Sequence, residues 1–376
     1  MRRQNSLVPS FLTAIIGITV LLELADGSER SAKAWQKVIA PRPFVFPDDH
    51  AAHEDYRVEW WYYTGNLQTD DGRRFGFELT FFRAGVDKNP KNPSRWAVRD
   101  LYIAHFAISD IRDRRFHFYE RSRRAGVGWA GASTERYHVW NEDWEVRLDG
   151  EDHLLKAQDG DCAIQLWLSP KKPHVLQGDR GLSQKGPSEG NASYYYSLTR
   201  LETSGSLTIE EETMPVTGLS WMDHEFSSSF LEQGQQGWDW MAIQLDNNQE
   251  MMIYQIRRND GTPDIHSSGT VIDERGRADP LRNDQFQLIP EDRWHSPDSG
   301  ARYPVLWTVR LPEKQTLLRV QAAFPEQEMN TLATIGTPYW EGSVIVTGTW
   351  EGEEVRGRGY LEMTGYRGRG LGGVYE

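Results

Sequence analysis

Aromatic and β-branched residues recur in short runs along most of the chain, with apolar positions spaced two apart. The two densest runs, residues 59–67 and 75–83, flank a turn-forming stretch at 69–72 and predict a β-hairpin. Five more strands are predicted further on, at residues 101–108, 116–119, 163–168, 193–198 and 207–210. No long segment has the 3.6-residue period of an amphipathic helix, so the pattern predicts an all-β protein.

The opening hairpin has a counterpart in the second half of the chain. A shift of 177 positions places Trp61 on Trp238 and Tyr63 on Trp240, and it superimposes the two turns. Two Trp-rich hairpins at this spacing indicate a duplicated β domain. Closure into a barrel removes sheet edges, and about eight strands enclose one small ligand. We therefore expect two consecutive antiparallel β-barrel domains, at residues 35–219 and 220–376, with β-sandwiches as the alternative.

The first 34 residues are typical of an export signal. Arg2 and Arg3 precede an apolar run of 12 residues, 11–22, and Ala32-Lys33-Ala34 offers a cleavage site. An uncleaved membrane anchor is the alternative, although the run is shorter than the ~20 residues of a comfortable span. In both cases we expect a periplasmic or extracellular protein.

The overall charge narrows the range of partners. With 55 acidic and 42 basic residues the chain carries a net charge of −13, whereas a phosphate backbone demands a basic face, so no nucleic-acid partner is expected. Cys162 is the only cysteine, so an exported chain has no internal disulfide to stabilise it. The single cysteine also argues against a cysteine-ligated zinc site.

The aromatic rings predict an apolar cavity. Both faces of the opening hairpin are aromatic, and fifteen Trp residues are many for this length, which suits a cavity that buries a hydrophobic small molecule. The structural alternative for Glu59 is an ion pair with Arg57 or Arg83. For His105 the alternative is a hydrogen-bonded core histidine, which is the more common role of such a residue. The candidate ligand-binding residues are Glu59, Trp61, Tyr63, Phe77, His105, Trp221, Trp238, Trp240 and Tyr254.

The strongest catalytic candidates are three consecutive ionisable residues, Asp223, His224 and Glu225. In an extended strand, Asp223 and Glu225 share one face with Trp221, while His224 points to the other face. Two carboxylates on one face push their pKa values apart, which leaves one protonated as a general acid. The structural alternative is a buried polar network that ties the two domains together.

Other kinds of chemistry find little support. There is no G-x-S-x-G elbow for a serine nucleophile and no H-E-x-x-H spacing for a metal. A metal site would have to use His224, Asp223 and Glu225 with His105, His53 or His50. We expect no metal site and no cofactor.

Six segments carry a resemblance to a known family: residues 53–65, 104–110, 178–183, 191–197, 221–226 and 359–366. In these segments the chain resembles the AttH and carotenoid 1,2-hydratase family of lipocalin-like proteins. The resemblance implies two lipocalin-like β-barrel domains and a lipid or isoprenoid ligand, and hydratase members add water to a terminal double bond without a redox cofactor. The chain departs from the hydratase pattern in having Gln255 and no acid beside Tyr254.

Two functions follow as hypotheses. The first is an exported, lipocalin-like carrier of a lipid or isoprenoid, working with a membrane-associated transport partner. The second is a hydratase or lyase, in which Asp223 or Glu225 protonates an alkene and His224 orients or deprotonates the attacking water. In the second, Trp faces would stabilise the resulting cation.

Overall fold

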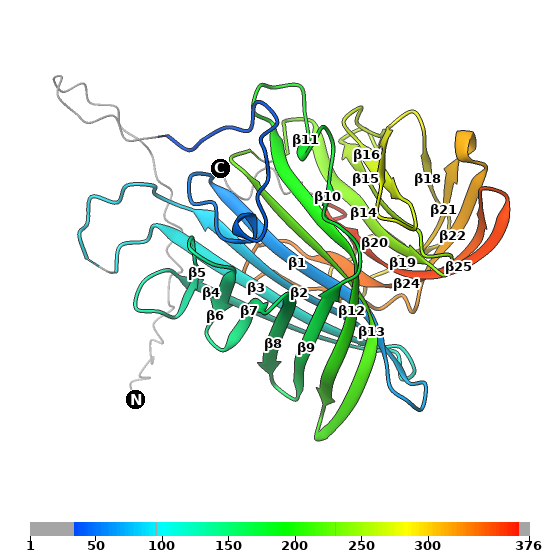
Figure 1. Cartoon of the computed structure of the whole chain (residues 1–376), viewed down its shortest axis with the longest axis horizontal. Coiled ribbons are helices and arrows are strands. Elements are labelled where there is room, and N and C mark those ends of the chain that lie inside the picture. The colour runs from blue at the N-terminus through cyan, green and yellow to red at the C-terminus, as the bar shows by residue number, and fades with distance from the viewer. Residues whose placement is uncertain (1–33, 95, 230, 368–376) are drawn as a thin grey trace, which may run out of the picture. The chain divides into compact units, whose positions relative to one another are not determined.

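Almost all of the regular structure is antiparallel β-sheet, in the computed structural model of the chain (Figure 1). The structure describes residues 34–94, 96–229 and 231–367, so the predicted export signal lies outside the described residues except for Ala34. Within these ranges no helix has the length and apolar character needed to cross a membrane. The all-β prediction is confirmed.

The first sheet runs in the order β4-β3-β2-β1-β13-β12-β9-β8-β7-β6-β5, with β10 and β11 added alongside β12. It closes almost completely into a barrel. Its strands are β1 (Val58–Gln68), β2 (Arg74–Gly85), β3 (Asp100–Asp110), β4 (Arg115–Arg124), β5 (Ala130–Ala132), β6 (His138–Asn141), β7 (Trp144–Asp149), β8 (Asp152–Asp159), β9 (Cys162–Pro170), β10 (Val175–Leu176), β11 (Leu182–Gln184), β12 (Ala192–Ile209) and β13 (Glu212–Ser227).

The second sheet runs in the order β17-β16-β15-β14-β25-β24-β22-β21-β18, with β23 alongside β24, and it remains a half-barrel. Its strands are β14 (Gln235–Leu245), β15 (Glu250–Arg258), β16 (Ser268–Ile272), β17 (Ala278–Arg282), β18 (Gln287–Pro290), β21 (Leu306–Leu311), β22 (Thr316–Ala322), β23 (Glu328–Met329), β24 (Tyr339–Trp350) and β25 (Glu353–Met363). A separate ribbon pairs β19 (Arg293–His295) with β20 (Arg302–Pro304), and two short 3-10 helices are η1 (Asp48–His50) and η2 (Pro312–Lys314).

The opening hairpin forms as its sequence predicts, with β1 paired to β2 across the turn at 69–72. Trp61 and Tyr63 of β1 point into the barrel with Phe77 of β2, and all three side chains are completely buried in one large apolar cluster. Side-chain alternation places Trp60 and Tyr62 on the opposite face, toward the second sheet. The aromatic rings of one face therefore fill the first barrel.

Strand β13 is the central wall of the molecule. It pairs with β1 on one side and with β12 on the other, and it crosses the expected domain boundary at residues 219 and 220. The first sheet accordingly extends to Ser227, and the second begins at Gln235. Met222 packs inside the barrel while Trp221 faces the second sheet, as the period of two predicts.

Polar contacts join the two sheets within the compact unit that the described residues form. Asn66 of β1 accepts a hydrogen bond from Ser343 Oγ at 2.5 Å and donates one to the Gly359 carbonyl at 3.1 Å. Ser109 of β3 donates to Gln327 at 2.6 Å. These buried hydrogen bonds fix the position of one sheet against the other.

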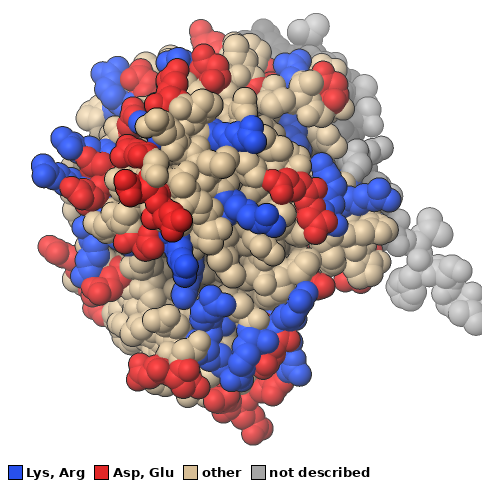
Figure 2. All heavy atoms as spheres, turned by 90° about the vertical axis from the view of Figure 1, so that its right-hand side faces the viewer, with Lys and Arg blue, Asp and Glu red and all other residues tan. Residues whose placement is uncertain are grey.

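Acidic and basic side chains both occur across the face that Figure 2 shows, and basic side chains gather from the middle of the view toward its lower part.

Candidate functional site

A cavity of about 200 Å³ lies between the two sheets, with walls from β1, β12 and β13 on one side and β14, β15 and β25 on the other. Aromatic and aliphatic side chains make up much of its lining, including Trp60, Trp238 and Ile256. Four carboxyl groups, one ammonium group and one guanidinium group also border it: Asp223, Glu225, Glu362, Glu59, Lys185 and Arg83. An apolar pocket with a few convergent polar groups is the usual form of a small-molecule site.

Asp223 is held in place by three donors. Ser197 Oγ and Trp221 Nε1 donate to its Oδ1 at 2.5 and 2.7 Å, and the Tyr195 hydroxyl donates to Oδ2 at 2.6 Å. Burial nevertheless raises the pKa of Asp223 to about 7, and the nearby charge of Glu225 adds to the rise while the three donors oppose it. This carboxyl group therefore exchanges its proton near neutral pH.

Glu225 and Lys185 form an ion pair at the cavity wall. Lys185 Nζ lies 3.2 Å from Glu225 Oε1, which also accepts a hydrogen bond from Ser193. The same ammonium group lies 4.1 Å from the centre of the Tyr254 ring, in cation–π geometry. Although burial opposes its charge, Glu225 raises the pKa of Lys185, so the lysine stays protonated at neutral pH.

Glu362 is the third carboxyl group of the cavity. It lies on β25 directly opposite Trp240 of β14, in the second sheet. Burial raises its pKa to about 7, the charges of Asp223 and Glu225 raise it further, and Trp238 and Lys185 act against the rise. Two carboxyl groups that titrate near pH 7 thus border one cavity.

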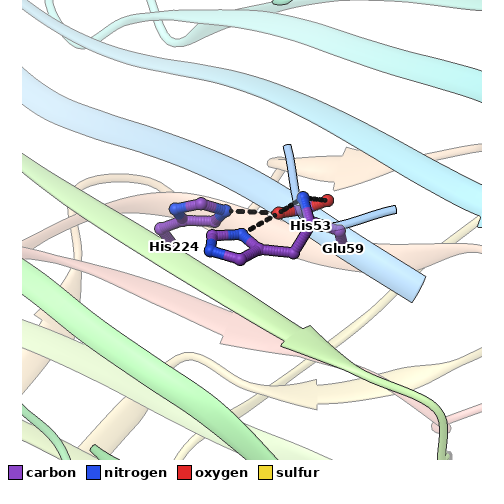
Figure 3. Close-up of side chains that lie close together, drawn as sticks. All are labelled: His53, Glu59 and His224. Carbon is purple, nitrogen blue, oxygen red and sulfur yellow. Dashed lines mark hydrogen bonds and ion pairs between the residues drawn. The ribbon is translucent and has the colours of Figure 1, made fainter. Parts of the chain in front are cut away.

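The opposite face of β13 carries a separate network inside the barrel (Figure 3). Glu59 Oε1 accepts hydrogen bonds from His224 Nε2 at 2.9 Å and from His53 Nδ1 at 2.8 Å. His53 Nε2 lies 3.0 Å from Asp49 Oδ1, so both ring nitrogens of His53 donate to carboxylates and its ring is positively charged. Burial alone would lower the pKa of His53, but the hydrogen bonds to Asp49 and Glu59 raise it above its usual value.

The three side chains of Figure 3 are of metal-ligating type, and their ligand atoms lie within 4.8 Å of one another. Each already has protein partners, however. Glu59 Oε2 is bound by Arg83 at 3.1 Å, and both ring nitrogens of His53 face carboxylates. A dication at this point would have to displace the His53 proton close to the Arg83 charge, so the surroundings fit a hydrogen-bonded network better than a metal.

The structure separates the residues that the sequence proposed for the site. Asp223 and Glu225 line the cavity with Trp238, Trp240 and Tyr254, and Glu59 borders it. His224 lies across the sheet from the cavity, hydrogen-bonded to Glu59 and Tyr196, so its position does not suit the expected role of orienting water beside Asp223.

The remaining candidates are packed away from the cavity. The barrel interior is filled by Trp61, Tyr63 and Phe77. Trp221 does not line the cavity, but its indole nitrogen donates a hydrogen bond to Asp223. His105 is fully buried against the second sheet, where its Nδ1 lies 2.7 Å from the Tyr339 hydroxyl. Burial lowers the pKa of His105 to about 3, so it is a neutral core histidine.

Lys185, Tyr195 and Glu362 are among the cavity residues that the sequence did not indicate as site residues. Glu362 carried a signal in the sequence, because it is a single acid between the apolar residues Leu361 and Met363. Lys185 lies near the end of a glycine-rich loop, and nothing in the sequence of this loop singles it out as a site residue. Only the pairing of β11 with β12 brings that loop to the cavity.

Comparisons with known proteins place these features in context. The model of the AttH-like family matches residues 37–366. A crystal structure from Nitrosomonas europaea, described as AttH, has 35% sequence identity and a TM-score of 0.81, and the match covers 89% of this chain and 100% of the other.

Two further relatives are more distant. Kievitone hydratase from Nectria haematococca shares the fold with a TM-score of 0.67 at 13% identity, over 88% of this chain and 98% of the other. The dehydratase asqC of Emericella nidulans is 24% identical over 210 residues, which is 50% of this chain and 54% of that protein. The chain thus spans about half the length of this curated relative.

Proposed function

Because the chain belongs to the AttH-like family and its cavity pairs two carboxyl groups that titrate near neutral pH, we propose that it is a cofactor-independent hydro-lyase, adding water to or removing it from an apolar molecule. The observation that most directly supports this proposal is that Asp223 and Glu362 lie on facing sheets around one apolar cavity. The names of the two distant relatives, a hydratase and a dehydratase, support this reaction class.

In this reaction one of the two carboxyl groups, Asp223 or Glu362, acts as the general acid and the other as the general base. Because both pKa values are about 7 and the charge of Asp223 raises that of Glu362, ionisation of one group favours protonation of the other near neutral pH. In hydration, the protonated group gives its proton to one alkene carbon, water attacks the other carbon, and the ionised group takes the proton that the water loses. Dehydration is the same sequence in reverse, so no redox partner is consumed.

The surroundings favour a positive charge on the reacting carbon. Trp238, Trp240 and Tyr254 present aromatic rings to the cavity, and cation–π attraction to a desolvated cation is worth about 2 kcal/mol or more. Lys185 would repel such a cation, but its charge is balanced by Glu225 at 3.2 Å. The ion pair also means that neither of these two charges at the cavity wall is left unpaired.

The volume of the cavity limits how much of a substrate molecule it can enclose. Its volume of about 200 Å³ is smaller than the roughly 300–1,000 Å³ of pockets that bury a whole drug-sized ligand. We therefore propose that it holds one end of a lipid or isoprenoid, with the double bond or hydroxyl group at that end.

The experiment incubates the purified protein with acyclic isoprenoid alkenes and with their tertiary alcohols, in water labelled with heavy oxygen. We expect label in the alcohol, with at least a 100-fold lower rate in Asp223→Asn and in Glu362→Gln. Tyr254→Phe is the matched control, because it keeps the ring and removes only a hydroxyl group. No label from any substrate, or full activity in both carboxyl variants, would refute the proposal.

The same proteins distinguish an enzyme from a carrier of an apolar molecule. A carrier would bind the alkene without labelling it, and its affinity would be unchanged by Asp223→Asn. Native mass spectrometry of each variant with the alkene measures that binding directly.

A further inference from the structure

One seam of the first barrel has no backbone pairing. In the described part of the chain, β4 is hydrogen-bonded to β3 and to no other strand, so its second edge is open. The turns that follow β8 and β6 approach this edge through side chains. Arg121 of β4 binds Asp159 at 3.0 Å, and Arg123 binds Glu142 at 2.7 Å.

Three potential metal ligands meet at the same seam. His117 lies on β4, while Asp161 and Cys162 lie at the turn from β8 into β9. One ligand atom from each lies within 4.8 Å of the others. The Cys162 thiol donates to Asp161 Oδ1 at 3.7 Å, and this oxygen also accepts a hydrogen bond from the Tyr119 hydroxyl at 2.8 Å, so a metal ion would take the place of the thiol proton. A tetrahedral zinc ion holds its ligand atoms about 3.5 Å apart, so small side-chain adjustments complete the geometry.

The imidazole of His117 gives an independent indication of a missing partner. Its Nε2 is shielded from solvent and has no hydrogen-bond partner among the described residues. A buried nitrogen without a partner costs free energy unless an ion or water satisfies it. The network around Glu59 differs in this respect, because both ring nitrogens of His53 are already bound.

We propose that His117, Asp161 and Cys162 bind a zinc ion that fastens the open seam of the first barrel. A thiolate and an imidazole favour zinc over magnesium or calcium, and the carboxylate completes a three-residue set with a water molecule in the fourth position. In the sequence, a single cysteine argues against a cysteine-ligated zinc site, but the fold brings His117, which lies 45 positions upstream, close to Cys162. None of its three residues lines the cavity, so we assign the site a structural role.

The test uses the full chain after removal of metals with a chelator. Cobalt(II) serves as the spectroscopic probe, because a thiolate ligand gives an intense near-ultraviolet charge-transfer band. We expect this band in the wild-type protein and its loss in Cys162→Ser. Zinc at a 100-fold excess over its dissociation constant should raise the melting midpoint by a few degrees.

Three variants make the outcome specific. His117→Gln and Cys162→Ser should weaken zinc binding at least tenfold, whereas Asp159→Asn, on the same turn but bound to Arg121, should retain it. Absence of the thiolate band in the wild-type protein would overturn the proposal even if a variant fails to fold. Stabilisation by zinc that survives Cys162→Ser but disappears in His53→Gln would place the metal at the Glu59 network and would also overturn it.

Discussion

At the scale of single residues, the molecule contains buried charges of two kinds. Glu59 is fully buried, yet hydrogen bonds from His224 and His53 and the charge of Arg83 outweigh burial and hold its pKa well below the usual range. At Asp223 and Glu362 the favourable contacts are too weak to offset the effect of burial, which raises the pKa of each carboxyl group to about 7. The first carboxylate is therefore a fixed charge, whereas the other two are exchangeable.

Removal of the fixed charge should be costly. In Glu59→Gln the buried guanidinium of Arg83 loses a carboxylate partner, and breaking a buried pair in this way costs about 3–5 kcal/mol. Urea denaturation at pH 7 measures the loss. Glu54→Gln is the control, because its pair with Arg99 is partly exposed and should contribute less than about 1 kcal/mol. Equal losses in the two variants would contradict the assignment.

The exchangeable carboxyl groups should make stability depend on pH. Asp223 has a folded pKa of about 7 against 3.8 in the unfolded chain, so between these values the folded state binds more protons. Its contribution to the free energy of unfolding therefore falls as the pH rises from about 4 to about 7, by roughly 4 kcal/mol.

Asp223→Asn removes this titration. We expect the stability of this variant, measured by urea denaturation relative to wild type, to rise between pH 4.5 and pH 8. An Asp70→Asn variant, in the exposed turn of the first hairpin, controls for the substitution itself. A constant difference across the range for Asp223→Asn would show that this carboxyl group keeps an ordinary pKa.

At the scale of elements, the pairing of β13 with β1 requires the two backbones to approach closely at Gly218. A Cβ atom added at Gly218 would lie 2.1 Å from the backbone oxygen of Asn66 on β1. Real Cβ atoms do not come so close, so the two strands would have to separate where they pair.

Gly218→Ala should accordingly destabilise the protein by about 1–3 kcal/mol, through strain at the centre of the first sheet. The midpoint of urea denaturation measures the effect. Thr217→Ala, on the exposed side of the same strand, is the control and should cost less. A Gly218→Ala protein as stable as wild type would mean that the strands separate without cost.

How far the sequence predicts these elements depends on the range of the interactions. Local alternation predicted the first hairpin and the opposite orientations of Asp223 and His224, because the period of two is a property of a single strand. It could not predict that Trp61 fills the barrel while Trp238 lines the cavity, since both lie in similar aromatic runs. Glu362 joins Asp223 only through the contact of two sheets, which no short window contains.

At the scale of the whole molecule, the two sheets share one buried polar interface. Lys172 of the first half binds Glu250 of the second at 2.8 Å, and both side chains are buried. The carboxyl groups of the cavity also come from both sheets. The site exists only while the sheets are joined.

Thermal unfolding should therefore be a single cooperative transition. We expect the calorimetric and van't Hoff enthalpies to agree. Val309→Ala, in the core of the second sheet alone, should lower the one midpoint rather than split it, since the cavity it leaves costs free energy that both sheets share. Two separate transitions in this variant would show that the sheets unfold independently.

The two-faced strand β13 also has a consequence for how this protein can change over evolutionary time or by engineering. Its odd positions, 221, 223 and 225, face the second sheet, and Asp223 and Glu225 among them line the cavity, whereas its even positions, 222 and 224, face the barrel. A deletion or insertion of one residue would exchange the two sets, so the strand can vary only by substitution. Substitutions at the odd positions can change the groups that face the second sheet and the cavity, while unchanged residues at the even positions keep the packing of the barrel. This strand is therefore a suitable starting point for redesign.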